Sequence, residues 1–485
     1  MKKILLFAIL AVGLFLYSCD VSDPNRPKLG VEFNQLVLSK YVALGNSLTS
    51  GFQSGGLAED FQLHSFPYYI AQQINYPDFQ QPLIASPGLG STPGKTPLMF
   101  DPATGLIFSE DLPVSDPRLL LKNALLPRPY DNLGIPGADL NTMLRGTSAN
   151  DTGNPFYDVV LRNPNFGNTT QVQQAILLNP TLITLWIGNN DVLGAALSGG
   201  DLNQITPVDK FQEDLGAILT ELTSKTKAFI VMANIPYVTD IPFVNALDVI
   251  YHTSPALGIQ VPVPVVFGAD FQPVDFDPNQ QGLFIPLLTE EQAPVHVLLP
   301  ALSAYKESGL GVPDSAALVG MGLPPATASA LVQGMIAAGL TPSGIPIPAN
   351  LTLTNDELTA IREAVDNFNS VIATLTGGKI PVFDANAMLG VLNTSGLDGY
   401  TGKFVLMDPA NTAFSLDGVH PNNGGYAIIA NAFINIINAA LDLNVPTLDT
   451  DQFKGQYLSA GKIEGLTWQA VNQVKHLFVK EKTAR

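Results

Sequence analysis

The stretch KYVALGNSLTSGF, residues 40–52, joins an apolar run to a turn of small and polar residues. Residues 41–44 have the composition of a buried strand, and Gly45 ends the run. Ser47 follows two positions later, with Gly51 close behind it. Two interpretations fit this stretch alone: an ordinary turn from strand to helix, or a serine nucleophile held on a sharp turn.

Four more apolar runs have the length and composition of buried strands: residues 130–133, 182–187, 228–232 and 380–383. Helix-like patterns separate several of them. Thr206 and Pro207 indicate a helix start ahead of apolar positions at helical spacing in 211–222. Thr354 and Glu357 form a capping-box pattern before the last run. This alternation predicts an α/β fold, a three-layer α/β/α sandwich around a central parallel sheet.

Two stretches interrupt the alternation and indicate large insertions. Residues 86–129 are rich in proline and glycine and contain LMFDPATGLIF, which is typical of a small hairpin. Residues 243–355 are poor in charge, and no charged residue occurs in 315–355. Glycine and proline break every apolar run there, so we do not expect a membrane span. We expect this insertion to pack over the sheet as a lid or wall beside Ser47, with scaffolding as the alternative.

The chain begins MKKILLFAILAVGLFLYSC, in which two lysines precede an uncharged apolar run. This pattern predicts an export signal too short to span a bilayer comfortably. Cys19 is the only cysteine, so no internal disulfide can form. Its position is similar to the lipobox of bacterial lipoproteins, which implies cleavage before Cys19 and its acylation. An accidental cysteine in a secretory signal is the alternative.

These features predict a lipid-anchored protein of the bacterial cell envelope, in the outer membrane, with the periplasmic or surface side left open. The expected organisation is a signal peptide at 1–18, a lipidated tether at 19–38, a catalytic domain at 39–445 that holds both insertions, and a helical extension at 446–485.

Composition argues against some classes of partner. The chain has 485 residues, 46% of them hydrophobic, which is enough for one large core or two. A formal net charge of −18 argues against nucleic acid as a partner. His64, His252, His296 and His476 lack metal-ligand spacing, and there is no glycine-rich phosphate loop. We therefore expect no metal and no cofactor, and the sequence predicts no oligomeric state.

Polar residues follow four of the predicted elements, where ligands of a parallel sheet bind. Hydrolysis by a serine needs a hydroxyl, a base, a group that orients the base, and donors for an oxyanion. Ser47 supplies the hydroxyl, and Asp417 lies three positions before His420, close enough for its carboxylate to reach one ring nitrogen. The amides of Ser47 and Gly137 and the side-chain amide of Asn190 can form an oxyanion hole.

The four blocks GNSLTSG, NLGIPGA, IGNND and DGVHPN, in this order, make the chain resemble the SGNH family, also called GDSL esterases and lipases. The resemblance implies a flavodoxin-like hydrolase fold with Ser47 as nucleophile and His420 as base. It also implies that Asp417 orients His420 and that Gly137 and Asn190 complete the oxyanion hole. Each block alone is weak evidence for the family, whereas four blocks in the family's order are strong evidence.

Some features of these blocks have other interpretations. Asn190 can cap a helix, Gly137 can be an ordinary turn glycine, and Asp417 can belong to an Asx-turn. Asn46 stands where the family has aspartate, which we expect to change hydrogen bonding in the loop more than activity. The blocks reach from residue 45 to 422, and the two insertions match no family pattern.

The expected function is hydrolysis of carboxylic esters through an acyl-enzyme, by an exported esterase or lipase. The apolar insertion favours acyl-chain esters, including lipids. A carbohydrate acetylesterase is the alternative, although only two tryptophans, Trp186 and Trp468, are present to stack on sugars. A non-catalytic lipid- or glycan-binding lipoprotein is an alternative of another class. The complete set of Ser47, Asp417 and His420 argues against it.

Overall fold

The computed structural model describes residues 35–480 except 102, 115, 164, 249–250, 255–258, 263–265, 268–272, 275–286, 288–294, 338, 406–407 and 458–464. The predicted signal, Cys19 and most of the tether lie outside these residues.

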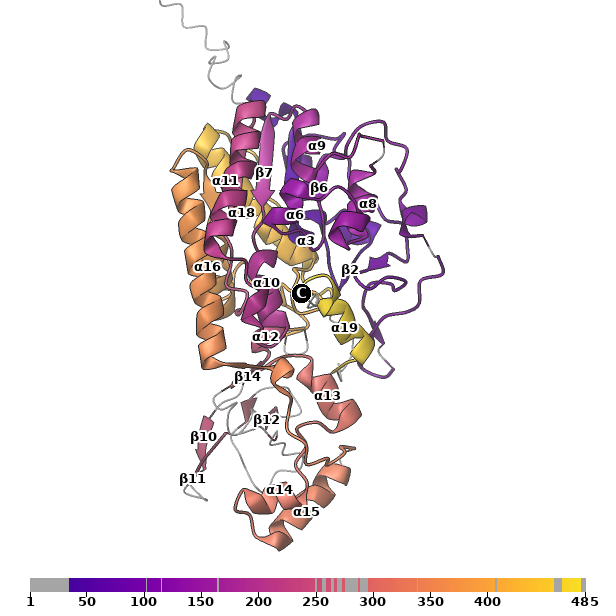
Figure 1. Ribbon diagram of the computed structural model, residues 1–485, viewed down its shortest axis with the longest axis vertical. Helices are drawn as coiled ribbons and strands as arrows, with labels where there is room; N and C mark the ends of the chain where they lie inside the picture. The colour runs from indigo at the N-terminus through magenta and orange to yellow at the C-terminus, as the bar shows by residue number, and fades with distance from the viewer. Residues whose placement is uncertain are drawn as a thin grey trace, which may run out of the picture.

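A five-stranded parallel sheet forms the centre of the molecule (Figure 1). Its strands, in spatial order, are β16 (Val382–Phe383), β8 (Phe229–Ala233), β7 (Leu182–Trp186), β1 (Tyr41–Gly45) and β6 (Asn132–Gly134). All five strands expected from the sequence are present, and β6 and β16 each begin two residues later than expected. The predicted α/β fold is confirmed.

Strand β1 shows why the fold has three layers. Its side chains alternate between two hydrophobic clusters, as the two-residue period of a strand requires. Val42 and Leu44 belong to the cluster on one face, and Tyr41 and Ala43 belong to the cluster on the other. Both faces are therefore buried, which explains why the strand is apolar throughout.

Helices cover the two faces. The face of Val42 and Leu44 packs against α6 (Leu140–Arg145), α9 (Gln171–Leu177), α10 (Asn190–Leu197), α11 (Val208–Lys225) and α16 (Asn355–Thr376). The opposite face packs against α5 (Phe66–Gln73) and α18 (Asn423–Leu441). Helix α18 is long and apolar enough to cross a bilayer, yet 61% of its most apolar stretch is buried in the protein. It is therefore a core helix here.

The two predicted helix starts have different outcomes. The capping box of α16 is confirmed, because Thr354 accepts from the amide of Glu357 and Glu357 accepts from the amide of Thr354. Helix α11 is present, but its N-cap residue is Pro207. The Thr206 hydroxyl instead donates to Asp191 at 2.8 Å. The Thr206 hydroxyl therefore binds a buried carboxylate and does not cap α11, so the predicted cap is wrong.

The insertion at 243–355 differs from the expectation. Figure 1 shows α13 (Ala301–Ser308), α14 (Ser315–Gly320) and α15 (Pro325–Ala337) as a lobe beyond the end of the sheet. Val312, Leu318, Ala328 and Met335 form a cluster separate from the main core. The ends of the insertion do pack into the main core, where Phe243, Leu299 and Leu353 are buried. The prediction that the insertion packs over the sheet is wrong for the described residues of this lobe. Their apolar side chains bury one another instead.

The first insertion contains the predicted hairpin, formed by β4 (Met99–Asp101) and β5 (Leu106–Phe108). Strand β17 (Gly465–Leu466) adds to β5 in parallel and leads into α19 (Trp468–His476). The other described elements are η1 (Val37–Ser39), α3 (Ser47–Ser50), β2 (Gly56–Leu57), α4 (Glu59–Gln62), β3 (Leu89–Gly90), η2 (Pro117–Leu120), α7 (Ala149–Thr152), α8 (Phe156–Leu161), η3 (Leu202–Gln204), α12 (Pro242–Asn245), β9 (Leu247–Asp248), β10 (Tyr251–Ser254), β11 (Ile259–Pro262), β12 (Val266–Phe267), β13 (Pro273–Val274), β14 (Val295–Val297), η5 (Ala349–Leu351), β15 (Thr352–Thr354), α17 (Ala385–Thr394) and η6 (Thr450–Phe453).

Candidate active site

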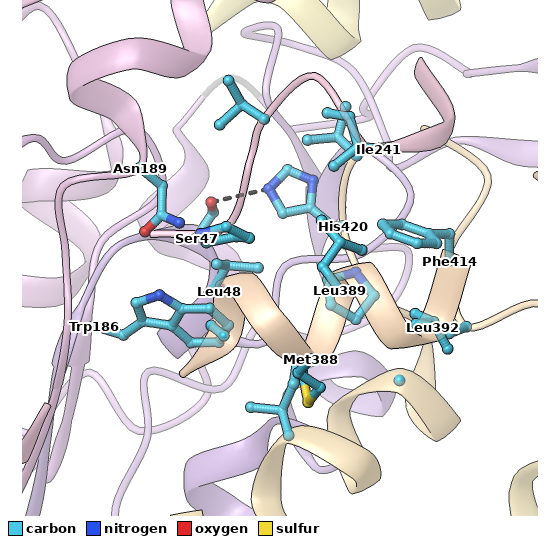
Figure 2. A pocket seen from close by; sticks show the side chains of 18 of the residues that line it. Ser47, Leu48, Trp186, Asn189, Ile241, Met388, Leu389, Leu392, Phe414 and His420 are labelled. Carbon is cyan, nitrogen blue, oxygen red and sulfur yellow. Dashed lines mark hydrogen bonds between the residues drawn. The ribbon is translucent and has the colours of Figure 1, made fainter. Parts of the chain in front are cut away.

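Ser47, Asp417 and His420 meet at the carboxyl edge of the sheet. Ser47 is the first residue of α3, just beyond β1. Its Oγ lies 2.9 Å from Nε2 of His420, and Nδ1 of His420 lies 2.9 Å from Oδ2 of Asp417 (Figure 2 shows the first contact). All three side chains are buried. A hydroxyl, an imidazole and a carboxylate are thus connected in series, as proton transfer from the serine requires.

The carboxylate of Asp417 is held by several donors. Oδ1 accepts from the amides of Val419 and His420, both at 2.9 Å, and from the Ser415 hydroxyl at 3.1 Å. Oδ2 accepts from the amide of Gly55 at 2.8 Å. Burial raises the pKa of Asp417, but the contacts with His420 and these amides outweigh burial and hold the pKa below its usual value. Asp417 is therefore ionised and can stabilise a protonated His420.

The turn that carries Ser47 depends on its neighbours. A Cβ at Gly45 would lie 2.4 Å from the carbonyl oxygen of Trp186, so a larger residue does not fit there. Asn46 caps α3, since its Oδ1 accepts from the amide of Leu48 at 3.1 Å. Glycine allows the close approach of β1 and β7, and the cap fixes the direction in which Ser47 leaves the strand.

The predicted oxyanion donors come from three loops. Among the described residues, the amides of Ser47 and Gly137 donate to no other group. Gly137 has φ +79°, a left-handed conformation that favours glycine. Asn190 Nδ2 donates to the carbonyl of Ala138 at 2.8 Å, which ties its loop to the residue after Gly137 and leaves its second N–H available.

The GDSL-like lipase/acylhydrolase family matches residues 41–433. This chain belongs to that family. Membership indicates a hydrolase of ester substrates. A comparison with curated proteins gives no match.

The departure of this GDSL-family chain at position 46 has a structural counterpart. Asn46 Nδ2 donates to Oδ1 of Asn189 at 3.2 Å, a bond that an aspartate at position 46 has no proton to make. Asn46 and Asn189 both line the pocket beside Ser47. The change of residue type therefore alters a hydrogen bond of the loop, as expected from the sequence.

A pocket opens beside Ser47 and His420 (Figure 2). Among the residues that the structure describes, its polar lining consists of these two residues and of Asn46, Asn189 and Asn190. The remainder is apolar and comes mainly from α17, α18 and the loop after β8: Pro236, Val238, Ile241, Met388, Leu389, Leu392, Ile428 and Ile429, with Trp186, Leu193 and Phe414. Gly137 is not among the described lining residues. The polar groups thus gather at one end of an apolar cavity.

No described residue of the insertion at 243–355 lines this pocket, so the described part of the insertion does not form the predicted lid. The main wall is α17, which the sequence analysis did not single out. The signal was the apolar run ANAMLGVL at 385–392, directly after the last strand of the sheet. The insertion instead contacts the loop that carries Asp417 and His420, where the amide of Phe243 donates to the carbonyl of Gly418 at 2.8 Å.

A second carboxylate, Asp191, is buried next to Asn190. Its Oδ2 accepts from the amide of Leu140 at 3.2 Å, and its Oδ1 accepts from Thr206. Burial and, to a smaller extent, the negative charge of Asp139 raise its pKa to about 7. Among the residues that the structure describes, no group of three or more His, Cys, Asp or Glu could hold a metal.

Proposed function

We propose that the protein is a serine esterase or lipase that hydrolyses carboxylic esters through an acyl-enzyme. The observation that carries this proposal is the pair of 2.9 Å contacts that joins Ser47, His420 and Asp417. In this role the Nδ1–H of His420 stays hydrogen-bonded to the carboxylate of Asp417, and Nε2 takes the proton from the Ser47 hydroxyl. The serine oxygen then attacks the ester carbonyl, and the imidazolium gains stability from the ionised Asp417.

The rest of the reaction uses the oxyanion donors. The amides of Ser47 and Gly137 and the free N–H of Asn190 stabilise the negative oxygen of the tetrahedral intermediate. Collapse of this intermediate breaks the ester bond, and His420 gives its proton to the departing alcohol. A water molecule then attacks the acyl-enzyme while His420 again takes the proton, which releases the acid and restores the Ser47 hydroxyl.

The pocket favours an acyl chain as the part of the substrate that it binds. Apolar side chains bind a hydrocarbon chain by removing it from water, and they offer no hydrogen bonds to sugar hydroxyls. Met388 and Leu392 of α17 face the chain in this arrangement. We therefore propose acyl-chain esters as substrates. Acetylated carbohydrate is the alternative substrate, and the experiment below tests it.

Purified protein with p-nitrophenyl acetate, butyrate and octanoate tests the proposal. We expect turnover that Ser47→Ala abolishes, while Ser50→Ala, which removes a hydroxyl from the same helix, retains it. Butyrate or octanoate should be hydrolysed with higher kcat/KM than acetate. Preference for an acetylated xylan over these esters would identify a carbohydrate esterase. Tight binding of an ester without turnover would identify a binding protein.

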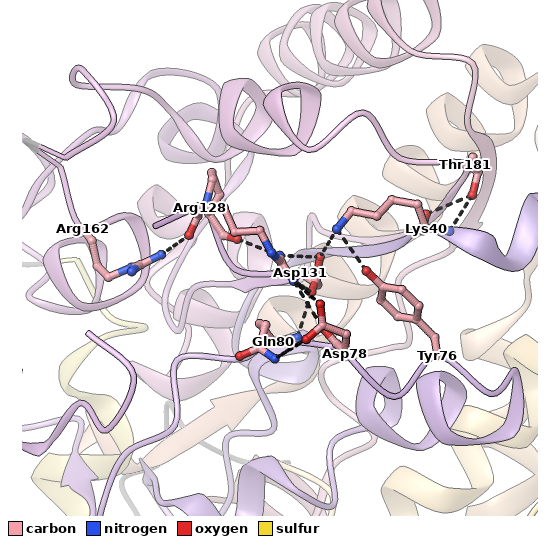
Figure 3. A network of polar contacts seen from close by, with 9 residues as sticks. Lys40, Tyr76, Asp78, Gln80, Arg128, Asp131, Arg162 and Thr181 are labelled. Carbon is pink, nitrogen blue, oxygen red and sulfur yellow. Dashed lines mark hydrogen bonds and ion pairs between the residues drawn. The ribbon is translucent and has the colours of Figure 1, made fainter. Parts of the chain in front are cut away.

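We also propose that the protein is exported and held at the bacterial outer membrane by acyl chains on Cys19. The sequence pattern at residues 1–19 supports this. The chain enters the sheet through Lys40, whose Nζ pairs with buried Asp131 at 2.9 Å (Figure 3). That entry lies at the amino end of β1, whereas Ser47 lies beyond its carboxyl end. Such an anchor would therefore hold the domain by the edge away from its site.

Labelling of cells with a radioactive fatty acid tests the anchor. Wild-type protein should carry the label and sediment with membranes. Cys19→Ser should lose both properties while keeping activity on a soluble ester. An unlabelled wild-type protein would contradict the lipid anchor without affecting the assignment of the catalytic residues.

A further inference from the structure

Residues 465–480, which we call the C-terminal strap, reach the active site from outside the part of the chain that matches the family. The strap begins with β17 on β5, and the amide of Thr467 donates to the carbonyl of Ile107 at 2.8 Å. Helix α19 then buries one face: Ala470, Val471, Gln473 and Val474. Figure 1 shows α19 alongside the central region of the molecule, near the end of the described chain.

Gln473 connects the strap to the triad through one glycine. Its Nε2 donates to the carbonyl of Gly55 at 3.1 Å and to that of Thr96 at 2.7 Å. The amide of the same Gly55 donates to Oδ2 of Asp417. Gln473 is fully buried, and the hydroxyl of Ser91 donates to its carbonyl. The strap therefore supports the loop that holds the orienting carboxylate.

Phe478 places the strap directly against the catalytic base. Its ring centroid lies 5.4 Å from that of His420 and 6.1 Å from that of Phe52, which itself lies 4.8 Å from His420. The adjacent Leu477 closes on the oxyanion loop, because a Cβ added at Gly137 would lie 3.3 Å from Leu477 Cβ. Aromatic rings from two distant segments thus contact the imidazole.

Lys480 ends the strap with an ion pair behind the oxyanion loop. Its Nζ lies 2.8 Å from Oδ2 of Asp139, two residues after Gly137. Asp139 is the N-cap of α6 and accepts from the amide of Thr142 at 2.8 Å. The backbone of Lys480 is fixed on both sides by Gln204, which accepts from its amide at 2.7 Å and donates to its carbonyl at 3.0 Å. Backbone hydrogen bonds to Gln204 and the charge of Asp139 therefore both hold the Lys480 ammonium in place.

We propose that the C-terminal strap is a working part of the active site, in which Lys480 is a positioning residue for the loop that carries Gly137. The inference rests on the proposed ester hydrolysis. Without Lys480 the buried carboxylate of Asp139 loses its counter-charge at the start of α6. Loss of this ion pair lets the start of α6 and the Gly137 turn shift, and donors to an oxyanion lose much of their effect when displaced by a fraction of an ångström.

The experiment compares Lys480→Met with Arg145→Met. Arg145 lies at the other end of α6 and pairs with Asp214 at 2.7 Å. The two pairs are matched, with side-chain exposures of 55% and 7% for Lys480 and Asp139 and 50% and 6% for Arg145 and Asp214. With p-nitrophenyl butyrate, Lys480→Met should lower kcat by about tenfold with little change in KM. Lys480→Arg should restore most of kcat, and Arg145→Met should leave it unchanged.

All rates are normalised to the folded fraction from thermal unfolding. Equal kcat values for Lys480→Met and Arg145→Met would overturn the inference, whereas an inactive wild-type protein would overturn the proposed function itself. If Lys480→Met does not fold, Asp139→Asn removes the same ion pair while keeping a good N-cap residue. It should lower kcat in the same way, and an unchanged kcat there would also overturn the role of Lys480.

Discussion

His420 Nε2 lies 2.9 Å from Ser47 Oγ, although 373 positions of the chain separate the two residues. Ser47→Ala and His420→Ala should each remove nearly all ester hydrolysis, because nucleophile and base act as a unit. The double variant should be no worse than either single variant. Initial rates with p-nitrophenyl butyrate measure this, and wild-type turnover in Ser47→Ala would reject the catalytic assignment.

Asn190→Ala should lower kcat by about 100-fold, which corresponds to the loss of one oxyanion donor, roughly 3 kcal/mol of barrier. The fold should change little in stability, because among the described residues the Asn190 side chain donates a single hydrogen bond, to the carbonyl of Ala138. Kinetics and thermal unfolding of the same preparation separate the two effects. A lower melting temperature with unchanged activity per folded molecule would mean that Asn190 only supports its helix.

Met388→Trp should shift substrate preference toward short acyl chains, because the larger ring fills the pocket beside α17. The ratio of kcat/KM for octanoate to that for acetate should fall by about tenfold. Val391→Trp is the control, since Val391 lies on the same helix and is 44% exposed. Equal ratios in the two variants would place the acyl chain outside this pocket.

Asp191→Asn should stabilise the protein increasingly as the pH rises from 4 to 7. The pKa of Asp191 is raised from 3.8 to about 7, so the folded state binds this proton more tightly than the unfolded chain. The stability gained from that proton is full below pH 3.8 and is lost as the pH passes through 7. Melting temperatures of both proteins across this range test the sign. A constant difference would mean that Asp191 does not titrate there.

The central sheet could be predicted from sequence because strands buried on both faces are continuous apolar runs, as in 41–44 and 182–187. The error at β6 has a local cause. Tyr130 looks like a strand residue, but its buried ring belongs to the segment before the strand, and its hydroxyl donates to the carbonyl of Asn123. The local sequence pattern was therefore enough to predict the strands of the sheet, but it was not enough to predict where β6 begins.

The triad could be located because Asp417 and His420 are close in sequence and because each block follows a recognisable element. The pocket walls could not be located in the same way. Low charge in 243–355 indicated burial without indicating against what: Phe243 and Leu299 pack in the main core, whereas Leu318 and Met335 pack in a separate cluster. Contacts such as Phe478 with His420 have no local signal, since neither residue's neighbours specify the other.

The position of each catalytic part along the chain also sets an order of biogenesis. A ribosome makes the nucleophile near the start, the base much later, and the contacts of Phe478 and Lys480 later still. A nascent chain that already holds β1 and Ser47 therefore has no means to activate the serine. On the proposed mechanism, ester cleavage can begin only after His420 has been made, and it reaches its full rate only after synthesis has passed Lys480.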